Sequence, residues 1–196
     1  MHEQGLIEAV QGGDTKAFGS LVETHQVRLY RAACCLTRSA SEAEDLAQET
    51  FVRAYRALGR FRGDCSFYTW LFAILLNVYR GWMRRERRRG RAQTNNPDVA
   101  DASPSPSRSV AARDDLDRVL RTIDGLPHRL REVLVLRHLE AMSYDEIALA
   151  VGCRPGTVRS RLHRARALLA VRCRQGRGDE SEIAPASFAE QGGTLR

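Results

Sequence analysis

The chain has 196 residues, 43% of them hydrophobic, which allows one ordinary domain or two small ones. Its longest stretch without a charged residue, positions 65–79, includes Ser66, Thr69 and Asn77 and is shorter than the roughly 20 apolar residues of a membrane span. The N-terminal sequence MHEQGLIEAVQGGD lacks the basic start and the apolar run of a signal peptide. We therefore expect a cytoplasmic protein with no membrane insertion.

The formal net charge of +7 is concentrated in two parts of the chain. Residues 1–91 contain 15 basic and 10 acidic residues, and residues 113–172 contain 12 and 8. The remaining segments, 92–112 and 173–196, each have a net charge of −1. All basic residues except Lys16 are arginines, a bias that a GC-rich coding sequence would also produce. Two basic segments favour two separate contacts with a polyanion such as nucleic acid.

The N-terminal part of the chain, residues 1–91, is predicted to be helical throughout. Apolar residues recur there at helical spacing, and Gly12 to Asp14, Arg38 to Ala40 and Gly59 to Asp64 interrupt the pattern. The predicted helices are 3–11, 15–37, 41–58 and 66–90.

The helix predicted at 41–58 has an apolar face and a polar face. The apolar face consists of Ala43, Leu46, Ala47, Thr50, Ala54 and Leu58. The opposite stripe consists of Asp45, Gln48, Glu49, Val52 and Arg56. From its chemistry alone, this stripe is a solvated charged face with one isolated valine.

The segment from Phe61 to Arg91 joins an aromatic-rich start to an arginine-rich end on one long helix. Aromatic residues at helical spacing usually belong to a core, so we expect Tyr68 and Trp70 to be packed rather than stacked on bases. Residues 63–66 form a loop that can close around an extruded base. Six arginines among residues 84–91 provide a track for a phosphate backbone.

Residues 92–112 contain three prolines and a cluster of Ser, Asn and Asp, which is typical of a flexible linker. Residues 113–172 are again helical, with helices predicted at 114–123, 128–139, 144–151 and 155–172. Neither part alternates like a β-strand. The predicted fold class is therefore all-α: two small helical domains joined by a flexible linker, followed by a polar, disordered tail at 173–196.

A helix-turn-helix is predicted between residues 143 and 172. Ser143 and Glu146 match a capping box at the start of the first helix, which ends at Gly152. After a short turn, Pro155 is suited to the first position of the second helix.

The second of these helices has a core face and a basic outer surface. Its core face consists of Val158, Leu162, Ala165 and Leu169. Ser160, His163 and Arg164 point away from the core, and Arg159, Arg161 and Arg166 lie on the flanks. Six arginines and no acid occur from Arg154 to Arg172. Because arginine pairs with guanine and neutralises phosphates, this helix is predicted to contact duplex DNA.

The five cysteines, at positions 34, 35, 65, 153 and 173, form no CxxC pair and have no histidine at zinc-ligand spacing. No metal or other cofactor is therefore predicted. We expect buried, reduced thiols, and the sequence leaves open whether the adjacent Cys34 and Cys35 respond to oxidants.

The C-terminal part resembles a conserved region of bacterial sigma factors. The run from Leu126 to Leu139, followed by SYDEIA and GTVRSRLHRAR, is similar to their fourth region, which reads the minus-thirty-five promoter element. The resemblance implies that Ser160, His163 and Arg164 read bases. It also implies that Arg159 and Arg161 hold the backbone or flanking bases.

The N-terminal part resembles the second region of the same family. DLAQETFVRAYRAL is similar to the segment that binds a coiled coil on the largest subunit of RNA polymerase, which implies polymerase contacts by Asp45, Gln48, Glu49 and Val52. The segment from Phe61 to Arg91 resembles the part that recognises and opens the minus-ten element. That resemblance implies a DNA-binding set of Asp64, Cys65, Ser66, Asn77, Arg84 and Arg85, the first four near a captured base. Ala73 and Gly81 stand where a basic residue and an Asp or Asn are common.

As a whole, the chain resembles the small, two-domain, extracytoplasmic-function type of sigma factor, which is not an enzyme. The resemblance implies promoter-specific initiation in a stress or envelope response. The expected partners are core RNA polymerase, through its coiled coil and its flap, promoter DNA and an anti-sigma factor.

Other classes of protein explain the sequence less well. A regulator that binds duplex DNA without polymerase would leave the stripe on 41–58 and the basic helix before the linker unexplained. A zinc-type anti-sigma factor would need a His-x3-Cys-x2-Cys arrangement, which is absent from the sequence. No set of acids, bases and nucleophiles indicates an active site.

Overall fold

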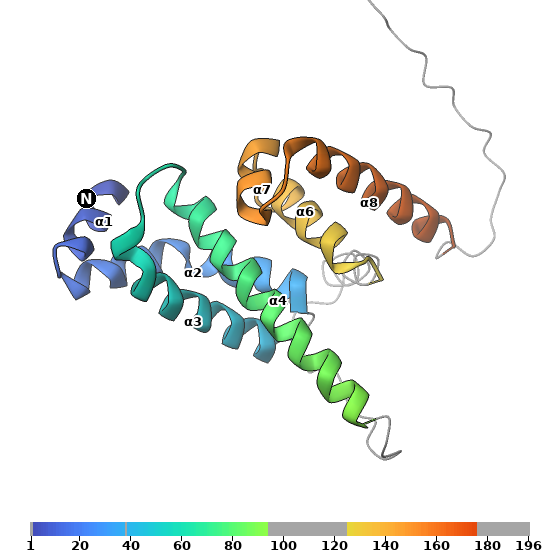
Figure 1. The fold of residues 1–196 in the computed structure, drawn as a ribbon, viewed down its shortest axis with the longest axis horizontal. Helices are drawn as coiled ribbons and strands as arrows, with labels where there is room; N and C mark the ends of the chain where they lie inside the picture. Colours follow the sequence, from blue (N-terminus) through green and yellow to red (C-terminus); the bar gives the residue numbers. More distant parts are fainter. Residues whose placement is uncertain (1, 38, 94–124, 176–196) are drawn as a thin grey trace, which may run out of the picture.

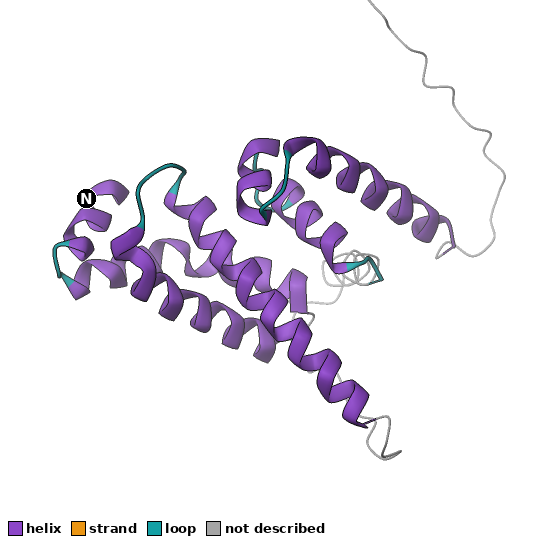
Figure 2. Cartoon of the chain, viewed as in Figure 1, coloured by secondary structure: helices purple, strands orange, loops and turns teal. Residues whose placement is uncertain are grey.

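The computed structural model describes residues 2–37, 39–93 and 125–175, which form two groups of helices (Figure 1). The first group consists of α1 (Glu3–Gln11), α2 (Thr15–Thr37), α3 (Ala40–Ala57), the 3-10 helix η1 (Leu58–Arg60) and α4 (Phe67–Gln93). The second group consists of α6 (His128–His138), α7 (Tyr144–Val151) and α8 (Pro155–Gln175). No strand occurs in these ranges (Figure 2), so the predicted all-α fold is confirmed.

The helix ends agree with the sequence to within three residues. The largest differences are at the C-terminal ends of α4 and α8, which continue to Gln93 and Gln175. These extensions, residues 91–93 and 173–175, consist of Arg, Ala, Cys and Gln, which can continue a helix, and they include no proline or glycine to stop it. The helix expected at 114–123, most of the expected linker and most of the expected tail lie outside the described residues.

Short polar residues cap the N-terminal ends of α2, α3 and α4. The carboxylate of Asp14 accepts the backbone N–H of Lys16 at 2.9 Å before α2. Ser39 accepts the N–H of Glu42 before α3, and Ser66 accepts the N–H of Thr69 at 3.1 Å before α4. Each cap satisfies a backbone donor that has no partner within the helix.

The two groups of helices share one apolar core. α7 packs against α4, and α6 packs against α2. Leu71 and Leu75 of α4 belong to the same buried cluster as Leu136 of α6 and Ile147 of α7. The two groups of helices, called the first and the second half below, are thus in direct contact in this structure.

Helix α6 is buried on all sides. Seven consecutive residues, Leu130 to Leu136, are buried, although an amphipathic surface helix would expose about half of them. Leu130 and Leu134 pack against Ala165 of α8, while Val133 and Leu136 join the core shared with α2 and α4.

Within the described ranges, no helix is long and apolar enough to cross a membrane.

Candidate functional site

The outer stripe of α3 forms an exposed ridge. Asp45, Gln48 and Glu49 are exposed, and Val52 keeps 44% of its accessible surface. On the opposite face, the apolar residues from Ala43 to Ala54 are buried, as the periodicity predicted. Glu49 is also paired with Arg53 at 2.7 Å, one turn further along the helix.

A groove lies on each side of this ridge. A groove of about 540 Å³ separates α3 from the C-terminal half of α4, and Asp45, Gln48, Glu49 and Val52 all line it. A second groove, of about 470 Å³, lies between α3 and α2 and is lined by Val27 and by Gln48. Val27 was not identified from the sequence. Its signal, an apolar residue on the exposed face of α2, resembles that of Val52.

The groove between α3 and α4 is acidic along its α3 wall. Burial raises the pKa of the Glu42 carboxyl, and the neighbouring carboxylates of Glu86 and Asp45 raise it further. Trp82 of α4 adds an apolar surface to the same groove. An amphipathic helix with basic side chains would be complementary to the α3 wall, whereas the α4 wall also carries Arg85 and Arg89.

The loop before α4 leaves polar side chains exposed. Gly63 adopts a φ of 77°, which favours glycine, and Asp64 and Ser66 are exposed. Cys65 is half-buried, and burial together with the charge of Asp64 raises the pKa of its thiol.

The aromatic residues at the start of α4 are packed, as expected. Tyr68 is buried, and Trp70 packs against Phe61 and Phe67 with ring centroids 5.1 and 5.7 Å apart.

The residues expected near a captured base lie along a line rather than around one pocket. Asn77 is exposed on α4, eleven positions after Ser66, which corresponds to about 16 Å along the helix axis. Eleven residues are close to three turns, so both side chains lie on the same face. Arg84 and Arg85 are exposed two turns further along, but Arg84 lines a cleft beside α6 and Arg85 lines the groove beside α3.

The helix-turn-helix has the predicted capping box. The Ser143 hydroxyl accepts the N–H of Glu146 at 3.2 Å, and the Glu146 carboxylate accepts the N–H of Ser143 at 2.8 Å. These hydrogen bonds lower the pKa of the Glu146 carboxyl. Gly152 ends α7 with a left-handed φ of 73°, and α8 begins at Pro155.

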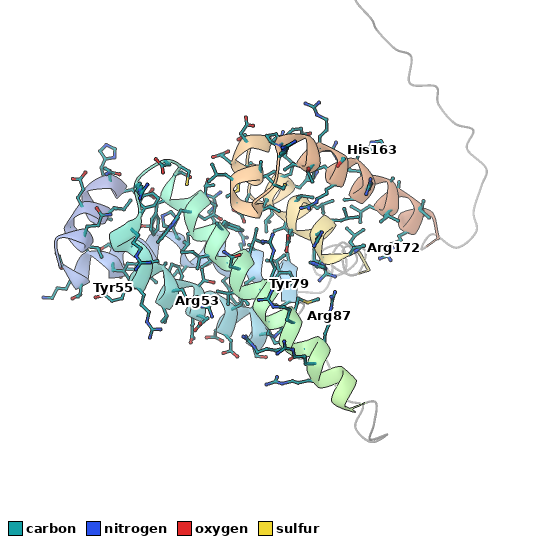
Figure 3. All side chains as sticks on the ribbon, in the orientation of Figure 1. Arg53, Tyr55, Tyr79, Arg87, His163 and Arg172 are labelled. Atoms are coloured by element: carbon teal, nitrogen blue, oxygen red, sulfur yellow. The ribbon has the colours of Figure 1, made fainter. Side chains whose placement is uncertain are left out.

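Most of the residues expected to contact duplex DNA are exposed on α8. Val158, Leu162 and Ala165 are buried, which confirms the predicted core face. The exposed set is Arg159, Ser160, His163 and Arg164, and Figure 3 labels His163 on this helix. Arg161 is different, because it is half-buried, lies 4.0 Å from the Cys153 Sγ and lines the cleft beside α4.

Two buried carboxylates of the second group are paired with arginines of the first group. Glu132 is fully buried, and Arg80 donates to it from Nε at 3.0 Å and from Nη2 at 2.8 Å. Glu140 is also buried and accepts hydrogen bonds from Arg28 Nε at 3.0 Å and from the Tyr68 hydroxyl. These pairs connect residues 52 and 112 positions apart. Sequence reasoning did not identify these pairs. The only signal was the position of Glu132 among the apolar residues of α6 and of Glu140 just after that helix.

Four of the five cysteines have described side chains. Cys34, Cys35, Cys65 and Cys153 are unbridged and partly buried, and burial raises the pKa of Cys34, which disfavours the reactive thiolate. In the described part of the chain, no group of three His, Cys, Asp or Glu residues could hold a metal ion.

Two family models match the chain. Residues 21–89 match sigma-70 region 2, and residues 116–169 match sigma-70 region 4. The chain therefore belongs to the sigma-70 class of transcription initiation factors. The first match covers α3 and α4, and the second covers the helix-turn-helix.

Curated relatives define the type of sigma factor. Over 177 residues the chain is 40% identical to the RNA polymerase sigma-H factor of Pseudomonas aeruginosa, covering 84% of this chain and 90% of the relative. It is 37% identical, with the same coverage, to the ECF RNA polymerase sigma-E factor of Escherichia coli K12. The chain is thus a member of the ECF sigma factors, which direct transcription initiation and are not enzymes.

Solved structures with the same fold include two protein complexes. A chain of the complex of CnrH with the cytosolic domain of CnrY is 32% identical, with a TM-score of 0.68, covering 88% of this chain and 97% of that one. A chain from the complex of the sigma factor RpoE with the anti-sigma factor NepR of Bartonella quintana is 28% identical, with a TM-score of 0.68. This match covers 83% of this chain and all of that one.

Proposed function

We propose that the α3 ridge binds core RNA polymerase through Asp45, Gln48, Glu49 and Val52. One observation carries this proposal: these four exposed side chains of one helix face line a single groove. The acidic α3 wall and the apolar surface of Trp82 suit an amphipathic helix with basic residues, which a coiled coil on the largest subunit can present. The protein would then act in the cytoplasm, where bacterial polymerase transcribes DNA.

The two DNA contacts are assigned to separate halves. The loop Asp64 to Ser66, together with Asn77, would hold unpaired bases of the minus-ten element, and Arg84 and Arg85 would hold its backbone. The exposed face of α8, with Ser160, His163 and Arg164 central and Arg159 and Arg161 flanking, would read the minus-thirty-five element. The exposure of four of these five α8 residues supports the second assignment.

A promoter with two elements requires the halves to separate. Roughly 16 base pairs between the elements, at about 3.4 Å each, correspond to about 55 Å. Here α4 packs directly on α7, and Arg161 is turned into the junction. We propose that the packed arrangement is a resting form, which opens when polymerase binds the α3 ridge and the polymerase flap binds the second half.

An anti-sigma factor would act on the same equilibrium. The related RpoE was solved in complex with the anti-sigma factor NepR. We propose that a protein of this kind controls the present chain, in a stress or envelope response, by stabilising the packed form.

Charge reversal tests the polymerase contact. Asp45→Arg should abolish binding to purified core polymerase in a gel-filtration assay, while the circular-dichroism spectrum stays unchanged because Asp45 is exposed. Glu8→Arg, which reverses an exposed charge on α1, is the matched control and should bind normally. Normal binding by the Asp45 variant, or an equal loss in both variants, would rule out the proposed ridge.

A further inference from the structure

A basic cleft lies where the two halves meet. It has a volume of about 400 Å³ and is bounded by α4, α6, the end of α7 and α8. Arg84 and Arg87 enter it from α4, His128 and Arg129 from α6, and Arg161 from α8. In Figure 3, Arg87 is labelled on the C-terminal part of α4.

Four of the five arginines that line this cleft form no ion pair with a described acid. Arg80, at the back of the cleft, is paired with Glu132. In the described part of the chain, however, no ion pair is formed by Arg84, Arg87, Arg129 or Arg161. These guanidinium groups repel one another, which raises the electrostatic free energy of the cleft. A bound anion would remove this repulsion.

The pKa of His128 depends on the charges around the cleft. Burial lowers the pKa of its imidazole, Glu132 raises it, and the charges of Arg87, Arg129 and Arg80 lower it further. Arg87 and Arg129 belong to different halves of the chain, yet both act on the same ring. Their charges therefore converge on one point in the cleft.

We propose that this cleft binds a small polyphosphate, that is, a chain of three or more phosphate groups, either free or carried by a nucleoside. Guanidinium groups recognise phosphate through paired, charge-assisted hydrogen bonds. Four such groups from three helices suit a ligand with several negative charges along a short chain. The volume lies within the range of small-molecule sites.

Such a ligand would fasten the two halves together. Arg87 of α4 and Arg129 of α6 line one cleft only while α4 packs on α7 and α6 packs on α2. The ligand therefore binds the packed form and stabilises it by mass action. An effect on transcription would follow only if the packed form is the resting state, as proposed above. Binding itself depends on the cleft alone, so it can be tested without polymerase or promoter DNA.

Titration calorimetry of the full-length protein with sodium tripolyphosphate tests this site. We expect saturable 1:1 binding that weakens by about tenfold or more in Arg129→Gln and also in Arg87→Gln, the loss expected for one paired guanidinium contact. Arg88→Gln is the matched control, because Arg88 is exposed on α4 and does not line the cleft. A parallel titration with GTP distinguishes the ligand sources: equal affinity assigns the phosphate chain alone, and tighter binding assigns a nucleotide.

Three results would overturn the proposal. The first is the absence of saturable binding by the unmodified protein. The second is an equal loss in Arg88→Gln, which would indicate general attraction to a basic surface. The third is a loss in only one of the two cleft variants, because a ligand held by one half cannot fasten both.

Discussion

Replacing Arg80 by methionine should open the packed form. Glu132 is fully buried and receives two hydrogen bonds from Arg80, at 3.0 and 2.8 Å. Removing the cation leaves an uncompensated buried carboxylate, which typically costs about 3–5 kcal/mol. Separation of the halves returns Glu132 to water and avoids that cost. The equilibrium should therefore shift toward the open form by about a hundredfold to several-thousandfold, since about 1.4 kcal/mol is tenfold.

Hydrogen exchange of the α6 and α7 amides, together with small-angle scattering, measures this opening. Arg80→Met should lose exchange protection in both helices and increase the radius of gyration. Arg89→Met is the control, because it breaks an exposed pair with Glu86 on the same helix, worth at most about 1 kcal/mol. Adding Glu132→Leu to Arg80→Met should restore packing by removing the buried charge. If the α6 and α7 amides were equally protected in Arg80→Met and in Arg89→Met, the Arg80–Glu132 pair would not hold the halves together.

Three further predictions concern base discrimination by α8, the length of the expected linker and the pH dependence of stability. Arg164→Ala should lose about 1–3 kcal/mol of base discrimination in the minus-thirty-five element, whereas Arg166→Ala should weaken binding to all sequences alike. Equal loss for every base with Arg164→Ala, measured on a panel of single-base variants, would reduce that residue to an electrostatic role. Deleting residues 100–107, which lie outside the described ranges, should cut the reach of the expected 21-residue linker from about 70 to about 45 Å. Initiation at two-element promoters should then fail, and wild-type transcript levels would refute the bipartite reading. The pKa of His128 is lower in the packed protein, so protonation favours opening or unfolding, and stability should fall as the pH drops through the usual histidine range. His128→Gln should show a smaller loss in urea unfolding between neutral and mildly acidic pH, and identical pH dependence would contradict this.

Local sequence signals were sufficient for the helices and their faces. The capping box at Ser143 and the turn at Gly152 depend on residues close in sequence, and the structure has both as predicted. The same holds for the core face of α8, because Val158, Leu162 and Ala165 recur at helical spacing. Periodicity determines which side of a helix is buried, but it does not identify the partner.

The contact between the halves could not be predicted because it depends on long-range pairing. The apolar and charged residues of α6 alternate around the helix without forming one apolar face, so its pattern gave no direction for packing. Arg159 and Arg161 were equivalent as flanking residues on the helical wheel. They differ in the structure because α4 lies beside Arg161 and not beside Arg159.

The central claim is that this chain directs polymerase to promoters with two elements by using one surface for polymerase and two for DNA. Run-off transcription of genomic fragments with purified core polymerase tests it most directly. We expect defined transcripts that require the protein, begin downstream of paired elements and disappear with Asp45→Arg. Sequence-specific binding of the protein to duplex DNA, with no transcript above that of core polymerase alone, would contradict the account.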